Sequence, residues 1–115
     1  MPQLTSSCYH PPLWLCSGHL QTIYPTLRRR VAGVAYRRER VELADGDFVD
    51  VDWCRGGARR AALVCHGLES NSRSHYVLGL VRALVRRGWD AAALNFRGCS
   101  GEPNRLLRSY HSGDT

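Results

Sequence analysis

The chain has 115 residues and a mass of 12.9 kDa, which suits one small domain. Hydrophobic residues make up 43% and charged residues 23%, so the chain is globular rather than disordered. The formal net charge is +6, and all 16 basic residues are arginines, spread from Arg28 to Arg108, which disfavours a concentrated nucleic-acid interface. We interpret the arginines mainly as residues of solvated faces, with a basic patch for acidic lipid or nucleic acid as the alternative.

Residues 1–34 form an N-terminal arm without a clean hydrophobic period. Four prolines interrupt it, and they are Pro2, Pro11, Pro12 and Pro25. Because proline interrupts regular structure, we expect an irregular arm with one short helix near residues 20–24.

The chain contains five cysteines, an odd number, and no C-x-x-C pair. This pattern disfavours a disulfide framework and favours a reducing compartment such as the cytoplasm. No signal peptide or membrane-spanning run is evident. Four side chains of the arm could offer zinc ligands: Cys8, His10, Cys16 and His19. Their spacing does not fit a standard zinc site, so we predict no metal site, and nothing in the sequence requires a cofactor.

After the arm, residues 36–43 and 48–53 alternate between apolar and charged side chains. The segment between them contains Asp45-Gly46, and these residues tolerate the positive φ of tight turns. The two segments therefore predict an antiparallel hairpin with one solvated face.

A strand, a helix and a strand follow the hairpin. Residues 61–65 are apolar without alternation, which is typical of a strand covered on both faces. The helix can be capped by Ser72 or Ser74 and ended by Gly88 in a left-handed conformation. Its apolar stripe consists of Val77, Leu80, Val81, Leu84 and Val85. Residues 91–96 form the second buried strand, so the chain predicts an α/β fold with a mixed sheet.

His66-Gly67-Leu68 ends the first buried strand, at the sheet edge where open α/β sheets bind ligands. Backbone N–H groups after Gly67, with Leu68 first, could stabilise the oxyanion of an acyl-transfer reaction. The alternative is that the turn only ends the strand, with His66 bonded to the backbone. We interpret His66 as a structural residue, because no nucleophile lies in a recognisable turn beside it.

Ser100 lies in Gly98-Cys99-Ser100-Gly101, which invites comparison with the nucleophile turn of serine hydrolases. That turn needs glycine two residues before and two residues after the serine. Here Glu102 occupies the second position, and Pro103 disfavours a helix at that point. We therefore predict that Ser100 is not a nucleophile. Cys99 has no evident activating partner and is interpreted as inert.

Five segments together resemble the YheT-type branch of the α/β-hydrolase fold, a group of serine esterases and lipases. They are G-H-L-Q-T-I-Y-P at 18–25, E-L-A-D-G-D-F-V-D-V-D-W at 42–53, H-G-L-E at 66–69, N-F-R-G-C-S-G-E-P-N-R at 95–105 and Y-H-S-G-D-T at 110–115. The resemblance implies that residues 35–115 supply the first four strands of an eight-stranded mixed sheet. It also implies that His66-Gly67-Leu68 forms half of an oxyanion hole and that the catalytic Ser, Asp and His follow beyond residue 115.

The resemblance predicts the N-terminal fragment of a serine carboxylic-ester hydrolase that acts through an acyl-enzyme on a small-molecule or lipid ester. The chain alone would be inactive, because no catalytic residue of the triad lies within it. The alternatives are a non-catalytic remnant, one half of a split protein that pairs with its missing C-terminal half, or a basic anion-binding module. An unpaired apolar edge at residues 61–65 or the neighbouring strand predicts poor solubility of the chain alone.

Overall fold

The computed structural model describes residues 8–108 and 110, in two compact units that comprise residues 1–30 and 31–115. In the first unit, the 3-10 helix η1 (Leu13–Leu15) precedes the helix α1 (Gly18–Arg28). The helix is longer than the sequence predicts, because it continues through Pro25. The Pro25 carbonyl still accepts a hydrogen bond from the Arg29 N–H at 3.0 Å, so the proline removes only a donor.

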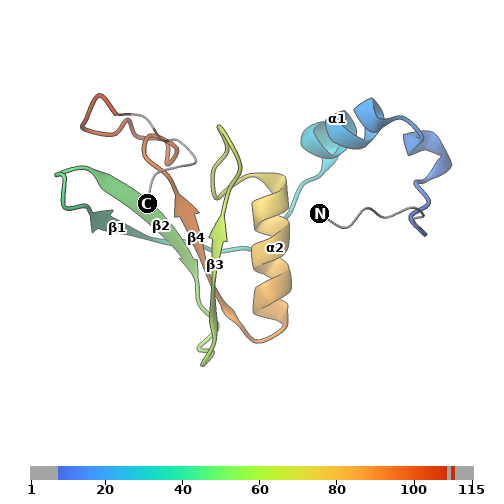
Figure 1. Cartoon of the computed structure of the whole chain (residues 1–115). Coiled ribbons are helices and arrows are strands. Elements are labelled where there is room, and N and C mark those ends of the chain that lie inside the picture. Colours follow the sequence, from blue (N-terminus) through green and yellow to red (C-terminus); the bar gives the residue numbers. More distant parts are fainter. Residues whose placement is uncertain (1–7, 109, 111–115) are drawn as a thin grey trace. The chain divides into compact units, whose positions relative to one another are not determined.

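The second unit is a four-stranded sheet with one helix (Figure 1). Its elements are β1 (Arg37–Glu42), β2 (Phe48–Cys54), β3 (Ala61–Cys65), α2 (His75–Arg86) and β4 (Asp90–Asn95). The strand order is β1-β2-β4-β3, with antiparallel pairing of β1 with β2 and of β2 with β4, and parallel pairing of β3 with β4. The predicted hairpin, β-α-β unit and mixed sheet are all confirmed.

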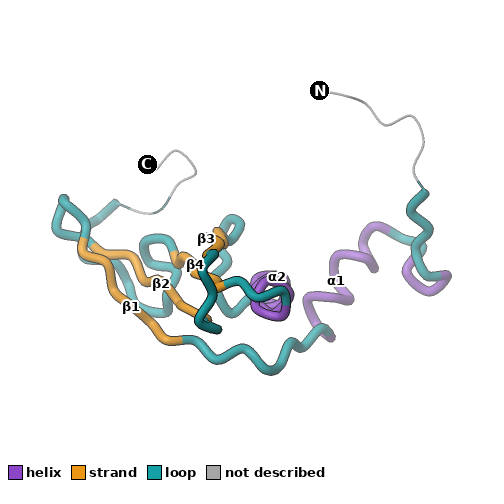
Figure 2. The backbone as a smooth tube through the Cα atoms, turned by 90° about the horizontal axis from the view of Figure 1, so that it is seen from below, coloured by secondary structure: helices purple, strands orange, loops and turns teal. Residues whose placement is uncertain are grey.

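The helix α2 packs on β3 and β4, and Figure 2 shows it end-on beside these strands. The predicted apolar stripe is correct except for Leu80, which is 50% exposed and lies outside the core. Val77 and Val81 are buried against Val64, Ala91 and Ala93. The helix ends as the sequence predicts, because Gly88 has a φ of 75° and the Trp89 N–H donates to the Leu84 carbonyl at 3.1 Å.

The predicted capping bond at the start of α2 is wrong in its detail. Ser74 occupies the N-cap position, but its hydroxyl makes no capping hydrogen bond. The hydroxyl oxygen instead lies 2.6 Å from that of Ser70. The capping side chain is therefore part of the loop after β3 rather than of the helix.

The alternating sequence predicts that the aspartates of β2 lie on a solvated face, and this prediction is wrong. Asp50 and Asp52 are 1% and 2% exposed, and Asp52 pairs with Ala93 of the buried cluster, so both face the α2 side. They are satisfied there by Arg38 and Arg40, which lie opposite them on β1. The Arg38 guanidinium donates two hydrogen bonds to the Asp52 carboxylate, at 2.8 and 2.9 Å, and that of Arg40 donates two to Asp50, at 2.8 and 3.0 Å.

The opposite face of the sheet carries mostly apolar side chains and is only partly covered among the described residues. Strand alternation places five apolar side chains on it: Val41, Val49, Val51, Leu63 and Leu94. Leu63 is 65% exposed, and of β3 only Val64 is buried. The prediction that β3 is covered on both faces is therefore wrong for these residues, because α2 covers one face only. In the described part of the chain β3 pairs only with β4, so the predicted unpaired apolar edge is present.

Candidate functional site

The loops after β3 and β4 meet through the imidazole of His66. The Phe96 N–H donates to Nε2 of His66 at 3.2 Å, and Nδ1 of the same ring lies 2.7 Å from the Gly67 carbonyl oxygen. Because Nε2 accepts, the proton lies on Nδ1 and is donated to that carbonyl. The ring is 5% exposed, and it packs edge-on against Phe96, which stacks on Tyr110. His66 thus links the carboxyl ends of two parallel strands through backbone groups.

The chain after His66 forms a tight turn from Gly67 to Ser70. The Ser70 N–H donates to the Gly67 carbonyl at 3.2 Å. The left-handed residue of this turn is Glu69, with a φ of 50°, and not Gly67. This left-handed conformation costs a non-glycine residue about 1–2 kcal/mol of conformational free energy. Such strained residues are often found at functional sites.

The backbone N–H groups of the turn differ in their partners. The Gly67 N–H donates to the Tyr76 hydroxyl at 2.8 Å, and that hydroxyl donates to Oγ of Ser70 at 2.9 Å. The role of Tyr76, on the first turn of α2, left no signal in the sequence. Among the described residues, the Leu68 N–H has no hydrogen-bond acceptor, and the Leu68 side chain is 79% exposed. The Glu69 N–H also has no acceptor among the described residues, so the Leu68 and Glu69 N–H groups are the donors of this turn that are available to a ligand.

Ser100 lies in the loop after β4. This loop begins with a turn in which the Cys99 N–H donates to the Phe96 carbonyl at 2.9 Å and Gly98 has a φ of 71°. No helix follows within residues 101–108, so the prediction that a loop follows Ser100 is confirmed for these residues. Burial raises the pKa of the Cys99 thiol, which disfavours the reactive thiolate.

Asp47, in the turn between β1 and β2, is the anchor for the loop after β4. Its carboxylate is fully buried and accepts bonds from the Arg97 guanidinium at 2.9 Å and from the Arg105 N–H at 3.0 Å. The Asn104 amide also donates to it, at 3.3 Å. Burial alone would raise the pKa of the Asp47 carboxyl, but these donors outweigh it and hold the pKa well below its usual range.

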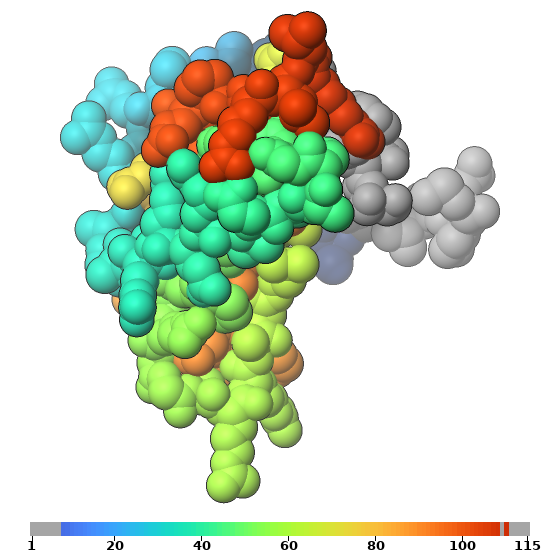
Figure 3. Space-filling view, turned by 90° about the vertical axis from the view of Figure 1, so that its left-hand side faces the viewer, coloured from blue at the N-terminus to red at the C-terminus, as the bar shows by residue number. Residues whose placement is uncertain are grey.

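Further ion pairs bind the same loop to the hairpin. Glu102 binds Arg40 at 3.0 Å, and Arg105 binds Glu42 with one bond of 2.9 Å. Figure 3 shows the loop, in red, lying directly on the hairpin, in blue-green and green. The interpretation of the arginines as solvated residues is wrong for Arg97, whose side chain is 11% exposed and holds both Asp45 and Asp47.

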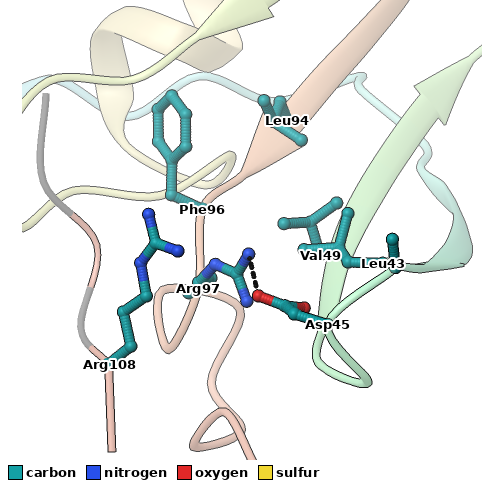
Figure 4. A pocket seen from close by; sticks show the side chains of 8 residues that line it. Leu43, Asp45, Val49, Leu94, Phe96, Arg97 and Arg108 are labelled. Carbon is teal, nitrogen blue, oxygen red and sulfur yellow. Dashed lines mark ion pairs between the residues drawn. The ribbon is translucent and has the colours of Figure 1, made fainter. Parts of the chain in front are cut away.

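A pocket of about 430 Å³ lies beside this anchor, between the hairpin turn and the end of β4 (Figure 4). Val49, Leu94 and Phe96 form apolar parts of its lining, and the Arg97–Asp45 pair, at 2.8 Å, lies at its side. The remaining lining residues are Leu43, Ala44 and Arg108. The pocket has the chemistry for an apolar group that carries a polar end.

The described residues contain no group of three or more His, Cys, Asp or Glu side chains that could hold a metal ion. The grouping of Cys8, His10, Cys16 and His19 is not such a cluster. All five cysteines are free thiols. None of the helices in the described residues could cross a membrane.

Comparison with known proteins places this geometry in context. No protein-family model matches the chain. The chain is 48% identical to YheT of Escherichia coli (strain K12) over 96% of this chain and 34% of that protein. YheT is named as an esterase, with that activity given as provisional. It is 26% identical to the human phospholipase ABHD3 over 97% of this chain and 30% of that protein. The chain thus spans about a third of the length of these relatives.

A solved structure supports the fold. The esterase Pf2001 of Pyrococcus furiosus superposes with a TM-score of 0.55 over 69% of this chain and 34% of that one, at 18% identity. At this identity the likeness concerns the fold alone. The four-stranded mixed sheet with its helix is therefore an α/β-hydrolase arrangement, as the sequence predicts.

Proposed function

We propose that this chain, which matches the N-terminal portion of the α/β-hydrolase branch that includes YheT and ABHD3, forms the oxyanion-binding side of an ester-hydrolysing site. The homologues support a hydrolase family, and the finer assignment rests on one observation. The Leu68 N–H has no acceptor among the described residues, and it lies after β3 in a turn held by His66 and Tyr76. A preorganised N–H donor of this kind is what acyl transfer requires.

In the proposed reaction, a serine oxygen from beyond residue 115 attacks the ester carbonyl, and its proton passes to a histidine base. The carbonyl oxygen becomes negatively charged and accepts the Leu68 N–H together with a second donor. The alcohol then leaves with that proton, and water hydrolyses the acyl-enzyme. The substrate class is a small-molecule or lipid ester, and the reaction requires no metal or cofactor.

The role of Leu68 can be tested in a chimera in which this chain replaces the matching segment of the E. coli relative. Leu68 is the second residue of the Gly67–Ser70 turn, a position that favours proline. Leu68→Pro therefore removes the N–H with little expected change of the turn, and Leu68→Ala is the matched control that keeps it. We expect Leu68→Pro to lower kcat on a p-nitrophenyl ester by roughly 10²–10³ and Leu68→Ala to have little effect.

Three results would contradict the proposal. One is a folded chimera that hydrolyses no ester. Another is a Leu68→Pro variant that keeps full kcat with an unchanged thermal melt. The third concerns the 115-residue chain alone, which we expect to be inactive; turnover by this chain that Ser100→Ala abolishes would make Ser100 the nucleophile.

The second candidate function is non-catalytic. A remnant, or one half of a split protein that needs its C-terminal partner, is compatible with the open sheet face and the unpaired edge of β3. A C-terminal half that restores ester hydrolysis when added in trans would identify the split protein.

We also propose a cytoplasmic location, which the five free thiols support.

A further inference from the structure

The N-terminal unit presents an apolar stripe that nothing in that unit covers. On α1 the spacing i, i+3, i+4 and i+7 brings four side chains to one face: Leu20, Ile23, Tyr24 and Leu27. All four are exposed, and Leu27 is 73% exposed. Trp14 of η1 extends the stripe, because its ring meets that of Tyr24 edge-on with centroids 4.7 Å apart.

The rest of α1 is polar but uncharged until its end. Gln21, Thr22 and Thr26 lie away from the stripe, and both threonine hydroxyls bond to carbonyls of the preceding turn, at 3.0 and 2.9 Å. Arg28-Arg29-Arg30 then follows, and all three arginines are exposed. The helix therefore joins an apolar face to a cluster of positive charge.

The first unit carries charge of one sign only. Residues 1–30 contain three arginines and no acidic residue, whereas residues 31–115 contain thirteen arginines and ten acidic residues. Half of the net charge of +6 thus belongs to the first 30 residues. In the second unit, several arginines make the ion pairs of the hairpin and its loop.

We infer that α1 docks the chain on an anionic lipid surface. In this arrangement Leu20, Ile23 and Leu27 enter the boundary between headgroups and acyl chains, and Arg28-Arg29-Arg30 binds the acidic headgroups. An apolar face combined with basic residues and no acidic ones is the combination that favours membrane interfaces. Trp14 and Tyr24 supply the amphipathic rings that favour the headgroup level. Nucleic acid would use the arginines but would leave the apolar stripe without a role.

This inference stands apart from the proposed ester hydrolysis, because it is measured without turnover. The 115-residue chain is floated in a density gradient with vesicles of phosphatidylcholine, with or without phosphatidylglycerol. Flotation separates bound protein from aggregates, which sediment. We expect the chain to float with the vesicles that contain phosphatidylglycerol and to be released at high salt.

Two variants test the two parts of the surface. Replacing Arg28, Arg29 and Arg30 with Gln should weaken binding by about 100-fold, since each arginine near an anionic surface contributes about tenfold or less. Leu20→Gln with Leu27→Gln should weaken binding by at least tenfold, because it removes apolar area from the interface.

Matched controls sit in the second unit. Replacing Arg59, Arg86 and Arg87 with Gln removes the same charge from exposed positions. Leu106→Gln with Leu107→Gln removes two exposed leucines from the loop after β4. Neither control should change vesicle binding by more than about twofold.

Several outcomes would overturn the inference. It is wrong if the parent chain does not bind the anionic vesicles, or if the controls weaken binding as much as the α1 variants do. It is also wrong if duplex DNA displaces the vesicles from the chain and the Leu20→Gln, Leu27→Gln variant binds vesicles and DNA as tightly as the parent chain does. That last result would identify a nucleic-acid surface made by the arginines alone.

Discussion

The two faces of the sheet divide its side chains in an unexpected way. The face beneath α2 buries carboxylates, among them Asp50 and Asp52, beside a small apolar cluster. The opposite face leaves apolar side chains such as Leu63 open. Polarity therefore does not identify the inner face here, because buried carboxylates are tolerated where paired arginines and amides satisfy every oxygen.

Asp52 shows how complete this satisfaction is. Besides Arg38, it accepts bonds from the Ser72 hydroxyl and, at 3.0 Å, from the Asn95 amide. The same Asn95 accepts the Ser72 N–H at 2.9 Å. One carboxylate thus connects β1, β4 and the loop before α2.

Asp52→Ala breaks that network and should destabilise the protein strongly. The change removes an acceptor from the buried Asn95 amide and Ser72 hydroxyl and from Arg38, whose side chain is 36% exposed, so we expect the free energy of unfolding to fall by about 2–4 kcal/mol. Urea denaturation followed by circular dichroism measures the loss. The matched control is Glu39→Ala on the other face, where the pair with Arg55 is at 3.9 Å and both side chains are 55% exposed. It should cost less than about 0.5 kcal/mol. Equal losses in the two variants would mean that the faces do not differ.

Acid should have the next largest effect, because it removes the charge of the buried face. Hydrogen bonds from Arg40 lower the pKa of Asp50, and burial raises the pKa of Asp52 but is outweighed by its donors. The unfolded carboxyls titrate at about 3.9, so the unfolded state binds more protons than the folded state as pH falls. Stability is thus retained above about pH 5 and lost below about pH 4. Thermal melts across this range check the prediction, and a constant Tm down to about pH 3 would contradict it.

The hairpin and the β-α-β unit were predictable because their signals are local. Asp45-Gly46 and the alternating segments specify the hairpin, and the stripe of α2 with Gly88 specifies the helix and its end. The inward aspartates were not predicted, since alternation defines two faces without saying which one is covered. A signal did exist, because the hairpin register sets Arg38 opposite Asp52 and Arg40 opposite Asp50.

The candidate site was less predictable than the fold. His66-Gly67-Leu68 could be placed at the sheet edge from the strand pattern alone. Its supports, the Phe96 N–H and the Tyr76 hydroxyl, come from positions 30 residues and 9 residues away in the chain. Likewise Asp47 anchors Arg105 across 58 residues. Contacts of this range depend on the folded topology, and no local pattern in the sequence announces them.

Truncating an apolar side chain should lower the free energy of unfolding by a smaller amount, and by different amounts on the two faces. Val81 is 0% exposed beneath the sheet, so Val81→Ala should cost about 2 kcal/mol through lost contacts and a cavity. Leu63→Ala, on the open face and on the edge strand, should cost less than about 0.5 kcal/mol. Removing Leu63 should also raise the soluble fraction of the chain alone, since an apolar edge promotes association. A large loss of stability in Leu63→Ala would show that the open face is covered in solution.

The smallest effect is on the titration of Tyr36, whose pKa depends on the burial and charge of the face beneath α2. Its hydroxyl donates to the Ser72 carbonyl at 3.0 Å. Burial, with a further contribution from the charge of Asp52, raises the pKa of Tyr36 to about 12. Because the folded pKa exceeds that of the unfolded chain, this contribution to stability is present below about pH 10 and is lost as pH rises towards 12.

Ultraviolet difference absorbance measures the ionisation of the five tyrosines, and Tyr36→Phe should remove the last step. Asp52→Asn keeps the shape of the side chain but removes its charge, so the pKa of Tyr36 should fall only part of the way towards 10. A partial fall is expected because burial is the larger cause and remains. If the pKa returned fully to 10, the charge rather than the burial would control Tyr36, and the α2 face would be wetter than its geometry indicates.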